Sequence, residues 1–325
     1  MDLTSISSRS RRRRRARNSR ASSQRGQSDR EYTVTFRLRF LTNGFMQRAW
    51  PEFAGRGRGA ALAPEDAKRY IDDMEDPVRN PVDPSLLEGE ARRAYVTRMF
   101  DQIAKPYDRL NQIISLGRVG AWRARAMEVA GAKPGETALD LGCGTGDLLL
   151  LLKERVGEAG SVAGLDPSEE MLALARRKWE ERGFAGEPDL RQGVAESTGF
   201  PDATFDLVTM GWVLRNVGDR NATYREVLRI LKPGGRLVSL DMSRSSFAPS
   251  RWAGALYLEG FMPVLVKVMG GDMESYRYLA RSTRRFPRAA ELAREWEAAG
   301  FRDVRYESLN VGTIAIHRGD KEPRA

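Results

Sequence analysis

The sequence predicts an α/β domain with a mostly parallel sheet, running from about residue 88 to residue 325. Two observations lead to this prediction. Short apolar stretches alternate with amphipathic helical stretches between residues 137 and 241, and a glycine-rich turn follows the first apolar stretch. Such alternation is typical of a parallel sheet with helices on both faces. We expect seven strands, the last two forming an antiparallel hairpin that closes the sheet.

The domain is expected to begin with helices. Residues 91–114 place five apolar side chains on one helical face: Tyr95, Val96, Met99, Phe100 and Ile103. A further helix is expected around Val119–Ala130. Both lie ahead of the first predicted strand.

The strands and helices of the sheet follow in alternation. Strands are predicted at 137–141, 161–165, 189–194, 205–210 and 236–241, and helices at 147–156, 168–182 and 219–230. Ser168 is suited to cap the second of these helices, and LKPGG (231–235) is expected to end the third. DVRYESL (303–309) and VGTIAIHR (311–318) predict the hairpin, with one or two turn residues between them.

The net charge of +10 belongs mainly to the amino-terminal tail. Residues 1–30 contain ten arginines and two aspartates, a net +8, so the rest of the chain carries only +2. We expect residues 1–87 to be a basic, largely disordered extension and linker, with one isolated strand at 32–40. The tail is also compatible with a targeting peptide or with contact to anionic lipid or RNA.

Composition excludes several classes of protein. A single cysteine, Cys143, rules out an internal disulfide and indicates a reducing compartment. One cysteine and one histidine, His317, do not make a Cys/His zinc site. No uninterrupted apolar stretch reaches about 18 residues, so no transmembrane helix is predicted.

The glycine-rich turn LDLGCGTGD (139–147) is the candidate ligand site, because ligands of open parallel sheets bind at the carboxyl ends of strands. A dinucleotide turn, G-x-G-x-x-G, would have its third glycine where Asp147 stands, and Gly146 comes one residue early. A P-loop would need G-K-[ST], which is absent. The turn therefore does not predict a pyrophosphate ligand.

Acidic residues surround this turn instead. Asp140 precedes it and Asp147 follows it, while Asp166 ends the next predicted strand, where an acid can accept both ribose hydroxyls. The site thus favours a nucleoside that carries positive charge and no phosphate. S-adenosylmethionine fits, with its ribose, sulfonium and ammonium groups. The alternative is that the glycines only form a tight turn and the acids only cap helices. The candidate cofactor-binding residues are Asp140, Gly142, Gly144, Gly146 and Asp166.

Several blocks resemble known enzymes. LDLGCGTGD, GLDPSEEML (164–172) and LRILKPGGRL (228–237) are similar to class I S-adenosylmethionine-dependent methyltransferases, whose sheet is Rossmann-like. Four more specific blocks resemble the ubiquinone/menaquinone biosynthesis C-methyltransferases: FDQIAKPYDRLNQIISLG (100–117), MGWVLRNVGDR (210–220), GDMESYRYLARSTRRFP (271–287) and AAGFRDVRYESLNVGTIAIHRG (298–319). The resemblance covers residues 90–320, approximately, and leaves the amino-terminal extension unexplained.

The resemblance implies methylation of a ring carbon of a polyprenylated quinol precursor, such as demethylmenaquinol or its ubiquinone-pathway equivalent. By position it assigns Thr145, Asp166 and the pair Val194 and Ala195 to S-adenosylmethionine, the pair flanking the adenine. The family usually has Asp or Asn where Val194 stands. The hydrogen bond that such a side chain can make to the adenine is therefore missing here. Glu196 is a candidate substitute, its alternative role being that of a solvated loop acid.

Two residues are candidates for catalysis. Arg215 is expected to stabilise the negative charge of a substrate phenolate, and Tyr107 to hydrogen-bond the substrate oxygen. A structural ion pair for Arg215 and simple packing for Tyr107 are the alternatives. His317 lies on the final strand and is expected to be structural, which leaves water or Asp241 to accept the proton.

The prenyl tail of such a substrate is insoluble in water, so we expect a cytoplasmic enzyme that contacts the membrane surface peripherally. Residues 250–270 are expected to cover the site and receive the tail, with core packing as the alternative. Their apolar side chains at helical spacing are Trp252, Leu256, Tyr257, Phe261, Leu265 and Met269. A homodimer is compatible with the sequence.

Two other functions stay open. One is methylation of another lipid acceptor, such as a sterol, a tocopherol precursor or a phospholipid amine. The other is a non-catalytic membrane- or RNA-binding protein that uses the Arg-rich tail. No N-P-P-Y tetrapeptide follows the fourth strand, which argues against amino methylation of nucleic acid, so no specific nucleic-acid partner is expected.

Overall fold

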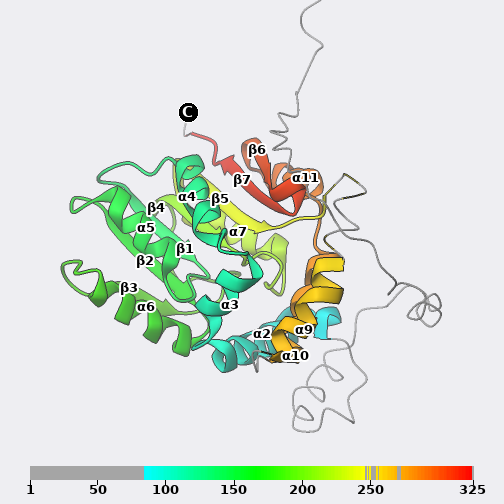
Figure 1. Cartoon of the computed structure of the whole chain (residues 1–325). Coiled ribbons are helices and arrows are strands. Elements are labelled where there is room, and N and C mark those ends of the chain that lie inside the picture. Colours follow the sequence, from blue (N-terminus) through cyan, green and yellow to red (C-terminus); the bar gives the residue numbers. More distant parts are fainter. Residues whose placement is uncertain are drawn as a thin grey trace, which may run out of the picture. The chain divides into compact units, whose positions relative to one another are not determined.

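A seven-stranded sheet organises the part of the chain that the computed structural model describes, residues 84–245, 247, 249, 254, 256–268 and 272–323 (Figure 1). The strand order is β3-β2-β1-β4-β5-β7-β6. The strands are β1 (Thr137–Leu141), β2 (Ser161–Asp166), β3 (Asp189–Gln192), β4 (Phe205–Gly211), β5 (Leu231–Met242), β6 (Arg302–Leu309) and β7 (Ile314–Asp320). β1 to β5 pair in parallel, and β7 runs antiparallel to β5 and β6. The predicted Rossmann-like sheet with its terminal hairpin is therefore confirmed.

Helices cover both faces of this sheet, as predicted. Those of the described residues are η1 (Pro84–Leu86), α2 (Gly89–Ile103), α3 (Tyr107–Ile114), α4 (Val119–Ala130), α5 (Asp147–Val156), α6 (Glu169–Glu181), α7 (Arg220–Ile230), η2 (Leu256–Phe261, π-helical), α9 (Met262–Val268), α10 (Met273–Arg285), α11 (Ala289–Ala299) and η3 (Asn310–Gly312). One apolar core holds Tyr224 of α7 and Trp296 of α11, and the other holds Met127 of α4 and Leu149 of α5.

The alternation of side chains along β1 explains how one strand serves both cores. Leu139 and Leu141 belong to the core under α7 and α11, whereas Ala138 belongs to the core under α4 and α5. All three side chains are fully buried, as expected for a parallel strand covered on both faces. The strand therefore ends with its turn held rigidly between two packed layers.

The connection of the hairpin is longer than predicted. Asn310 to Thr313 lie between β6 and β7, instead of one or two residues. Three consecutive residues, Asn310, Val311 and Gly312, have positive φ angles of 51°, 57° and 84°. This compact turn brings Gly312 against Ser245, since a Cβ on Gly312 would lie 3.0 Å from the Ser245 Oγ. The sequence pattern did not show this packing, so the prediction was wrong about the turn.

The expected single amphipathic helix at 91–114 is two helices. α2 ends at Ile103 and α3 begins at Tyr107, with Pro106 between them. Proline disfavours the helical conformation in the residue before it, which separates the two segments. Tyr95, Val96 and Met99 of α2 are buried, as the pattern predicts.

β5 is also longer than predicted. α7 ends at Ile230, and the strand begins at the next residue, so LKPGG ends the helix as expected but is part of the strand. The pairing with β4 shifts register between Phe205 and Leu207. Gly235 fits this irregularity because a Cβ there would lie 2.9 Å from the carbonyl oxygen of Lys232.

The described chain begins four residues ahead of the expected domain start at residue 88. Ser85 accepts a hydrogen bond from the Arg285 guanidinium (2.5 Å), and Leu87 is buried beside Tyr278. Residues 1–83 of the extension predicted to be disordered, with the strand predicted at 32–40, lie outside the described residues. Within the described ranges, no helix is both long and apolar enough to span a bilayer.

Candidate active site

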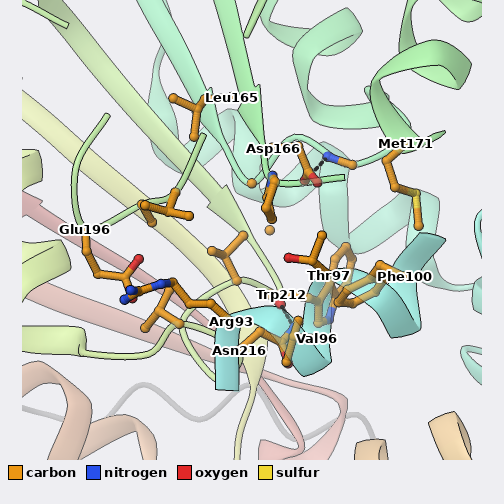
Figure 2. A pocket seen from close by; sticks show the side chains of 18 of the residues that line it. Arg93, Val96, Thr97, Phe100, Leu165, Asp166, Met171, Glu196, Trp212 and Asn216 are labelled. Atoms are coloured by element: carbon orange, nitrogen blue, oxygen red, sulfur yellow. Dashed lines mark hydrogen bonds and ion pairs between the residues drawn. The ribbon is translucent and has the colours of Figure 1, made fainter. Parts of the chain in front are cut away.

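A pocket opens at the carboxyl ends of β1, β2 and β4 (Figure 2). It encloses about 700 Å³ of space, its solvent-filled mouth included. Its wall comes from α2, α3 and the loops after β1, β2, β3 and β4. The lining residues are Arg93, Val96, Thr97, Phe100, Tyr107, Gly142, Gly144, Leu165, Asp166, Pro167, Met171, Val194, Ala195, Glu196, Gly211, Trp212, Val213, Asn216 and Val217.

The glycine turn forms the floor of this pocket. Gly142 has φ +72°, and a Cβ there would lie 2.4 Å from the Val213 Cγ2. Gly144 has φ +53° and faces open space, with no heavy atom within 4 Å of an added Cβ. Both backbone conformations are unfavourable for residues with side chains. Cys143, between them, points away from the pocket and packs on Gly164 of β2.

Asp166 is the buried acid of the pocket, only 8% exposed. Its Oδ2 accepts a hydrogen bond from the Gly144 N–H (2.8 Å), and its Oδ1 accepts one from the Ser168 N–H (2.9 Å). Burial raises the pKa of Asp166 to about 6, although these two N–H groups oppose the shift. Each oxygen keeps a lone pair for a ligand. The carboxylate is thus oriented by the backbone and fits the two hydroxyls of a ribose.

The two acids beside the turn do not face the pocket as the sequence interpretation assumed. Asp140 is 1% exposed and accepts a hydrogen bond from the Thr209 hydroxyl (2.7 Å), and burial raises its pKa to about 7. Asp147 pairs with Lys178 (2.7 Å) and Arg123 (2.5 Å). Neither carboxylate lines the pocket. Of the three aspartates, only Asp166 lines the pocket, and the assignment of Asp140 to the cofactor stays a prediction.

Thr145 and Gly146 also lie outside the lining. The Thr145 hydroxyl donates to Asp108 (2.8 Å) and accepts from Lys178 (2.9 Å). Gly146 is the residue before α5, and an added Cβ would lie 3.0 Å from the Ala175 Cβ. Both residues support the turn on the side away from the pocket. Their assignment to the cofactor stays a prediction.

Val194 and Ala195 line the pocket next to Glu196. Glu196 is not a solvated loop acid. Its side chain is 9% exposed, and its Oε1 accepts hydrogen bonds from the Gly218 N–H (2.7 Å) and the Asp219 N–H (3.2 Å). The Arg93 guanidinium of α2 also lies 3.4 Å from this oxygen (Figure 2).

Arg215 lies behind the pocket wall and not in it. It is 7% exposed, donates to the Asn216 Oδ1 (3.0 Å), and has its Nε 3.8 Å from Asp241. Asn216 does line the pocket, and its Nδ2 donates to the Trp212 carbonyl oxygen (3.0 Å). Burial raises the pKa of Asp241 to about 6, and the charge of Arg215 opposes that shift. Asn216 separates Arg215 from the pocket, so Arg215 can affect a bound substrate only without direct contact.

Tyr107 begins α3 and lines the pocket, in edge contact with Phe100 at 5.7 Å between ring centroids. Burial raises the pKa of Tyr107 above its ordinary value, and the nearby charge of Arg215 opposes the rise. The phenol is therefore protonated near neutral pH and can donate a hydrogen bond into the pocket. This placement is compatible with the role predicted for Tyr107.

The surroundings of His317 indicate a structural role. It lies on β7, is 1% exposed, and its Nε2 donates to the Ala289 carbonyl oxygen (2.9 Å). Burial lowers its pKa to about 4. A neutral imidazole held in this way, outside the pocket lining, is not placed to accept a proton from a ligand there.

Trp212 is the pocket residue that sequence reasoning missed most clearly. It follows β4 with φ +59°, an uncommon conformation for a bulky residue. Its backbone N–H donates to the Leu240 carbonyl oxygen (2.7 Å), and the Arg123 guanidinium lies 5.4 Å from its ring centroid. Its place directly after the fourth strand was the available signal, because that strand end borders the pocket.

Proteins of known structure share this fold. Solved structures with a similar fold include the [4+2]-cyclase SpnF, with a TM-score of 0.52, 19% identity, and coverage of 70% of this chain and 96% of that one. Phosphoethanolamine N-methyltransferase 2 of Haemonchus contortus, solved with S-adenosyl-L-methionine, has a TM-score of 0.50 and 15% identity, covering 72% and 60%. At these identities the likeness shows the fold alone.

Proteins found by sequence comparison are more similar to this chain than these two structures are. A demethylmenaquinone methyltransferase of Desulfitobacterium hafniense is 39% identical over 235 residues, which are 72% of this chain and 93% of that protein. One of Staphylococcus aureus is 40% identical over 237 residues, 73% of this chain and 97% of that protein. With the shared fold, these relatives show that the chain is an S-adenosylmethionine-dependent methyltransferase. It belongs to the ubiE/COQ5 methyltransferase family, whose model matches residues 88–321.

Proposed function

We propose that this protein transfers a methyl group to a ring carbon of demethylmenaquinol, a polyprenylated quinol. The observation that carries the proposal is the identity of 39% to 40%, over nearly their whole length, with relatives named demethylmenaquinone methyltransferase. The pocket agrees with it. Beside the polar end at Asp166, its wall is apolar and aromatic, with Phe100, Trp212 and Val213. Such a wall can hold a flat ring.

The cofactor end of the pocket is built to bind and orient. Asp166 would hold the ribose hydroxyls, with its oxygens fixed by the Gly144 and Ser168 N–H groups. Gly144 leaves space for a ligand close to the backbone, and Val194 and Ala195 would flank the adenine. When bound, S-adenosylmethionine supplies an activated methyl group. The protein's own contribution is then mainly positioning, which can lower a barrier substantially.

The substrate end holds the polar groups proposed for catalysis. Tyr107 would donate a hydrogen bond to a substrate oxygen, and Asn216 would present its amide to the same region. Arg215 would stabilise a phenolate from behind Asn216, because its guanidinium is fixed and largely removed from water. Asp241 is not in the lining, so water is the better candidate to accept the ring proton.

Cells that lack their own quinone methylase and accumulate demethylmenaquinone provide the test of this function. Expression of this protein should convert their main lipid quinone to one heavier by a single methylene unit, measured by mass spectrometry of extracted quinones. The Asp166→Asn variant, expressed at the same level, should restore far less. An unchanged quinone pool, with adenosyl compounds bound by the purified protein, would contradict the substrate proposal. A methylated sterol or phospholipid in its place would support the alternative acceptor.

We further propose peripheral contact with the membrane through an apolar patch. Four apolar side chains just after α3 and on η2 and α9 are 56% to 68% exposed and would form this patch: Leu116, Leu256, Phe261 and Val264. The Tyr257 hydroxyl donates to the Ile114 carbonyl oxygen (3.1 Å), which ties η2 to the end of α3. Beneath the patch, Met262 and Val266 pack against Tyr276 of α10. Residues Trp252 and Met269 of the predicted lid, and the side chain of Leu265, lie outside the described residues.

α10 adds positive charge next to this patch. It carries four arginines and one glutamate, and Arg277 and Arg281 are exposed. Exposed apolar groups beside arginines are typical of surfaces that bind anionic bilayers. A bilayer would also present the prenyl tail of the substrate close to α3 and the pocket.

Replacing Phe261 and Val264 together by Ser should weaken binding to vesicles of anionic phospholipid at least about tenfold, because each inserted side chain contributes roughly 1.5–3 kcal/mol. Co-sedimentation measures this. Methylation of a short-tailed, water-soluble quinol should stay unchanged. As a control, Tyr306→Ser removes an exposed side chain on the edge strand β6 and should leave vesicle binding intact. If the double variant instead lost a homodimer and kept its vesicle binding, the patch would be a subunit interface.

A further inference from the structure

We propose that Asp108, Lys178 and Thr145 are positioning residues that hold helices α2 and α3 closed over the cofactor end of the pocket, and that this contact sets the rate at which the cofactor is exchanged. Residues Gly89–Ile114, which comprise α2, α3 and the break between them, are called the cap below. The proposal rests on the cofactor assignment made above, but not on the identity of the methyl acceptor.

The cap forms part of the pocket wall without belonging to the layers around the sheet. Arg93, Val96, Thr97 and Phe100 of α2 and Tyr107 of α3 line the pocket. Figure 1 shows α2 beside α10, at a distance from β6 and β7. A ligand at Asp166 would therefore lie between the sheet and the cap.

The cap has apolar packing on one side. Tyr95, Val96 and Met99 form a cluster with Leu87 and with Tyr278 of α10, where the rings of Tyr95 and Tyr278 are 5.4 Å apart. None of these residues belongs to the two cores of the sheet. The cap is thus anchored by burial toward α10.

On the side of the cofactor loops, polar contacts attach the cap at three points. After β1, Thr145 donates to Asp108 of α3. After β2, Ser168 donates to Asp101 of α2 through a short hydrogen bond. After β3, Glu196 pairs with Arg93 of α2 at 3.4 Å. Each of the three loops expected to hold the cofactor therefore has its own contact to the cap.

The Asp108 contact is the most extensive of the three. Its Oδ1 accepts from the Thr145 hydroxyl (2.8 Å), and its Oδ2 pairs with the Lys178 Nζ (2.6 Å). Lys178 also contacts Thr145 (2.9 Å) and Asp147 (2.7 Å), so it links α6, the glycine turn and the cap. The side chains of Asp108 and Lys178 are 41% and 21% exposed, and water can compete for such a pair. These contacts can break and re-form without disturbing the apolar anchor.

Tyr107 directly precedes Asp108 in α3, so a contact that holds Asp108 in place also holds Tyr107 in place. When the Asp108 contact is closed, Tyr107 is held in the pocket wall. When it opens, α3 can move about the break at 104–106 between α2 and α3. The contact therefore couples retention of the cofactor to the placement of the proposed substrate hydrogen-bond donor.

Two substitutions test the proposal, Asp108→Asn, which keeps the shape and removes the charge, and Lys178→Met, which keeps most of the stem. The first readout is hydrogen exchange of the α3 backbone amides in the ligand-free protein, which should become about three- to tenfold faster in each variant. The second is the dissociation rate of S-adenosylhomocysteine, which should rise by a similar factor, with a smaller change in the association rate. The double variant should resemble the single ones, since both remove the same contact.

Lys232→Met is the matched control. Lys232 pairs with Asp206 at 2.7 Å, and the two side chains are 39% and 30% exposed, but they lie at the opposite end of β4. This variant should leave both readouts unchanged. Unchanged exchange and dissociation in Asp108→Asn and Lys178→Met, or equal changes in Lys232→Met, would overturn the proposal. Faster exchange without any adenosyl binding by the wild type would contradict the cofactor assignment and with it the proposal, whereas failure to methylate the quinol would contradict only the proposed substrate.

Discussion

Asp166→Asn is expected to weaken binding of S-adenosylhomocysteine about a hundredfold, since two hydrogen bonds to a charged acceptor contribute roughly 1.5 kcal/mol or more each. The carboxylate is fixed by the N–H groups of Gly144 and Ser168, so the two ribose hydroxyls would meet preoriented acceptors. An amide offers one oxygen and turns the other position into a donor. Isothermal titration calorimetry measures the change.

The same variant should also change the pH dependence of binding. Burial raises the pKa of Asp166 to about 6 in the free protein. The ionised form accepts the ribose hydroxyls, so the affinity of the wild type should increase as pH rises from about 5 to 7. Asp166→Asn should lose this increase between pH 5 and 7.

Two checks separate binding from folding in this experiment. In Asp166→Asn the amide NH2 faces the backbone N–H of either Gly144 or Ser168, so the variant should lose some stability, and affinities are compared well below its melting temperature. Asp189→Asn, an exposed aspartate at the start of β3, should bind S-adenosylhomocysteine normally. Equal affinities for Asp166→Asn and the wild type would remove the basis of the cofactor assignment.

Arg215→Met is expected to lower the free energy of unfolding by about 3 kcal/mol at pH 8, because it leaves the buried Asp241 without its cation. The pKa of Asp241 in the folded protein, already about 6, would rise further, while that of the unfolded chain stays near 3.9. The folded state then favours the protonated acid, so the loss of stability should be smaller at pH 5 than at pH 8. Urea unfolding at the two pH values measures this.

The double variant Arg215→Met with Asp241→Asn distinguishes a structural from a catalytic role of Arg215. Removal of both charges should restore part of the stability at pH 8. Methyl transfer to the quinol should nevertheless remain at least about a hundredfold below wild type if the guanidinium stabilises a phenolate. Recovery of activity together with stability would show that Arg215 serves only as the partner of Asp241.

The sheet could be predicted from the sequence because its signals are local. β1 and α5 have the predicted bounds, since an apolar strand and a glycine turn define them without help from distant residues. The hairpin turn was predicted too short because Gly312 packs on Ser245, more than sixty residues earlier in the chain. Such a long-range contact leaves no periodic pattern.

The candidate site was predictable only in part, for a related reason. Gly142, Gly144 and Asp166 follow strand ends and could be identified by position alone. The partners of Asp147 could not, because Lys178 and Arg123 come from two other helices and neutralise a charge that the sequence shows as free. Arg215 was expected to face the substrate, whereas its side chain lies behind Asn216.

Cys143 gives the glycine turn a chemical property that matters if the substrate is the proposed quinol. Oxidised quinones are electrophiles that alkylate thiolates, and the reactive form of cysteine is the thiolate. Burial, together with the charges of Asp166 and Asp140, holds the pKa of Cys143 well above its ordinary value. The sulfur therefore stays a protonated thiol packed against β2, and the loop proposed to receive the methyl donor keeps its thiol in the unreactive form.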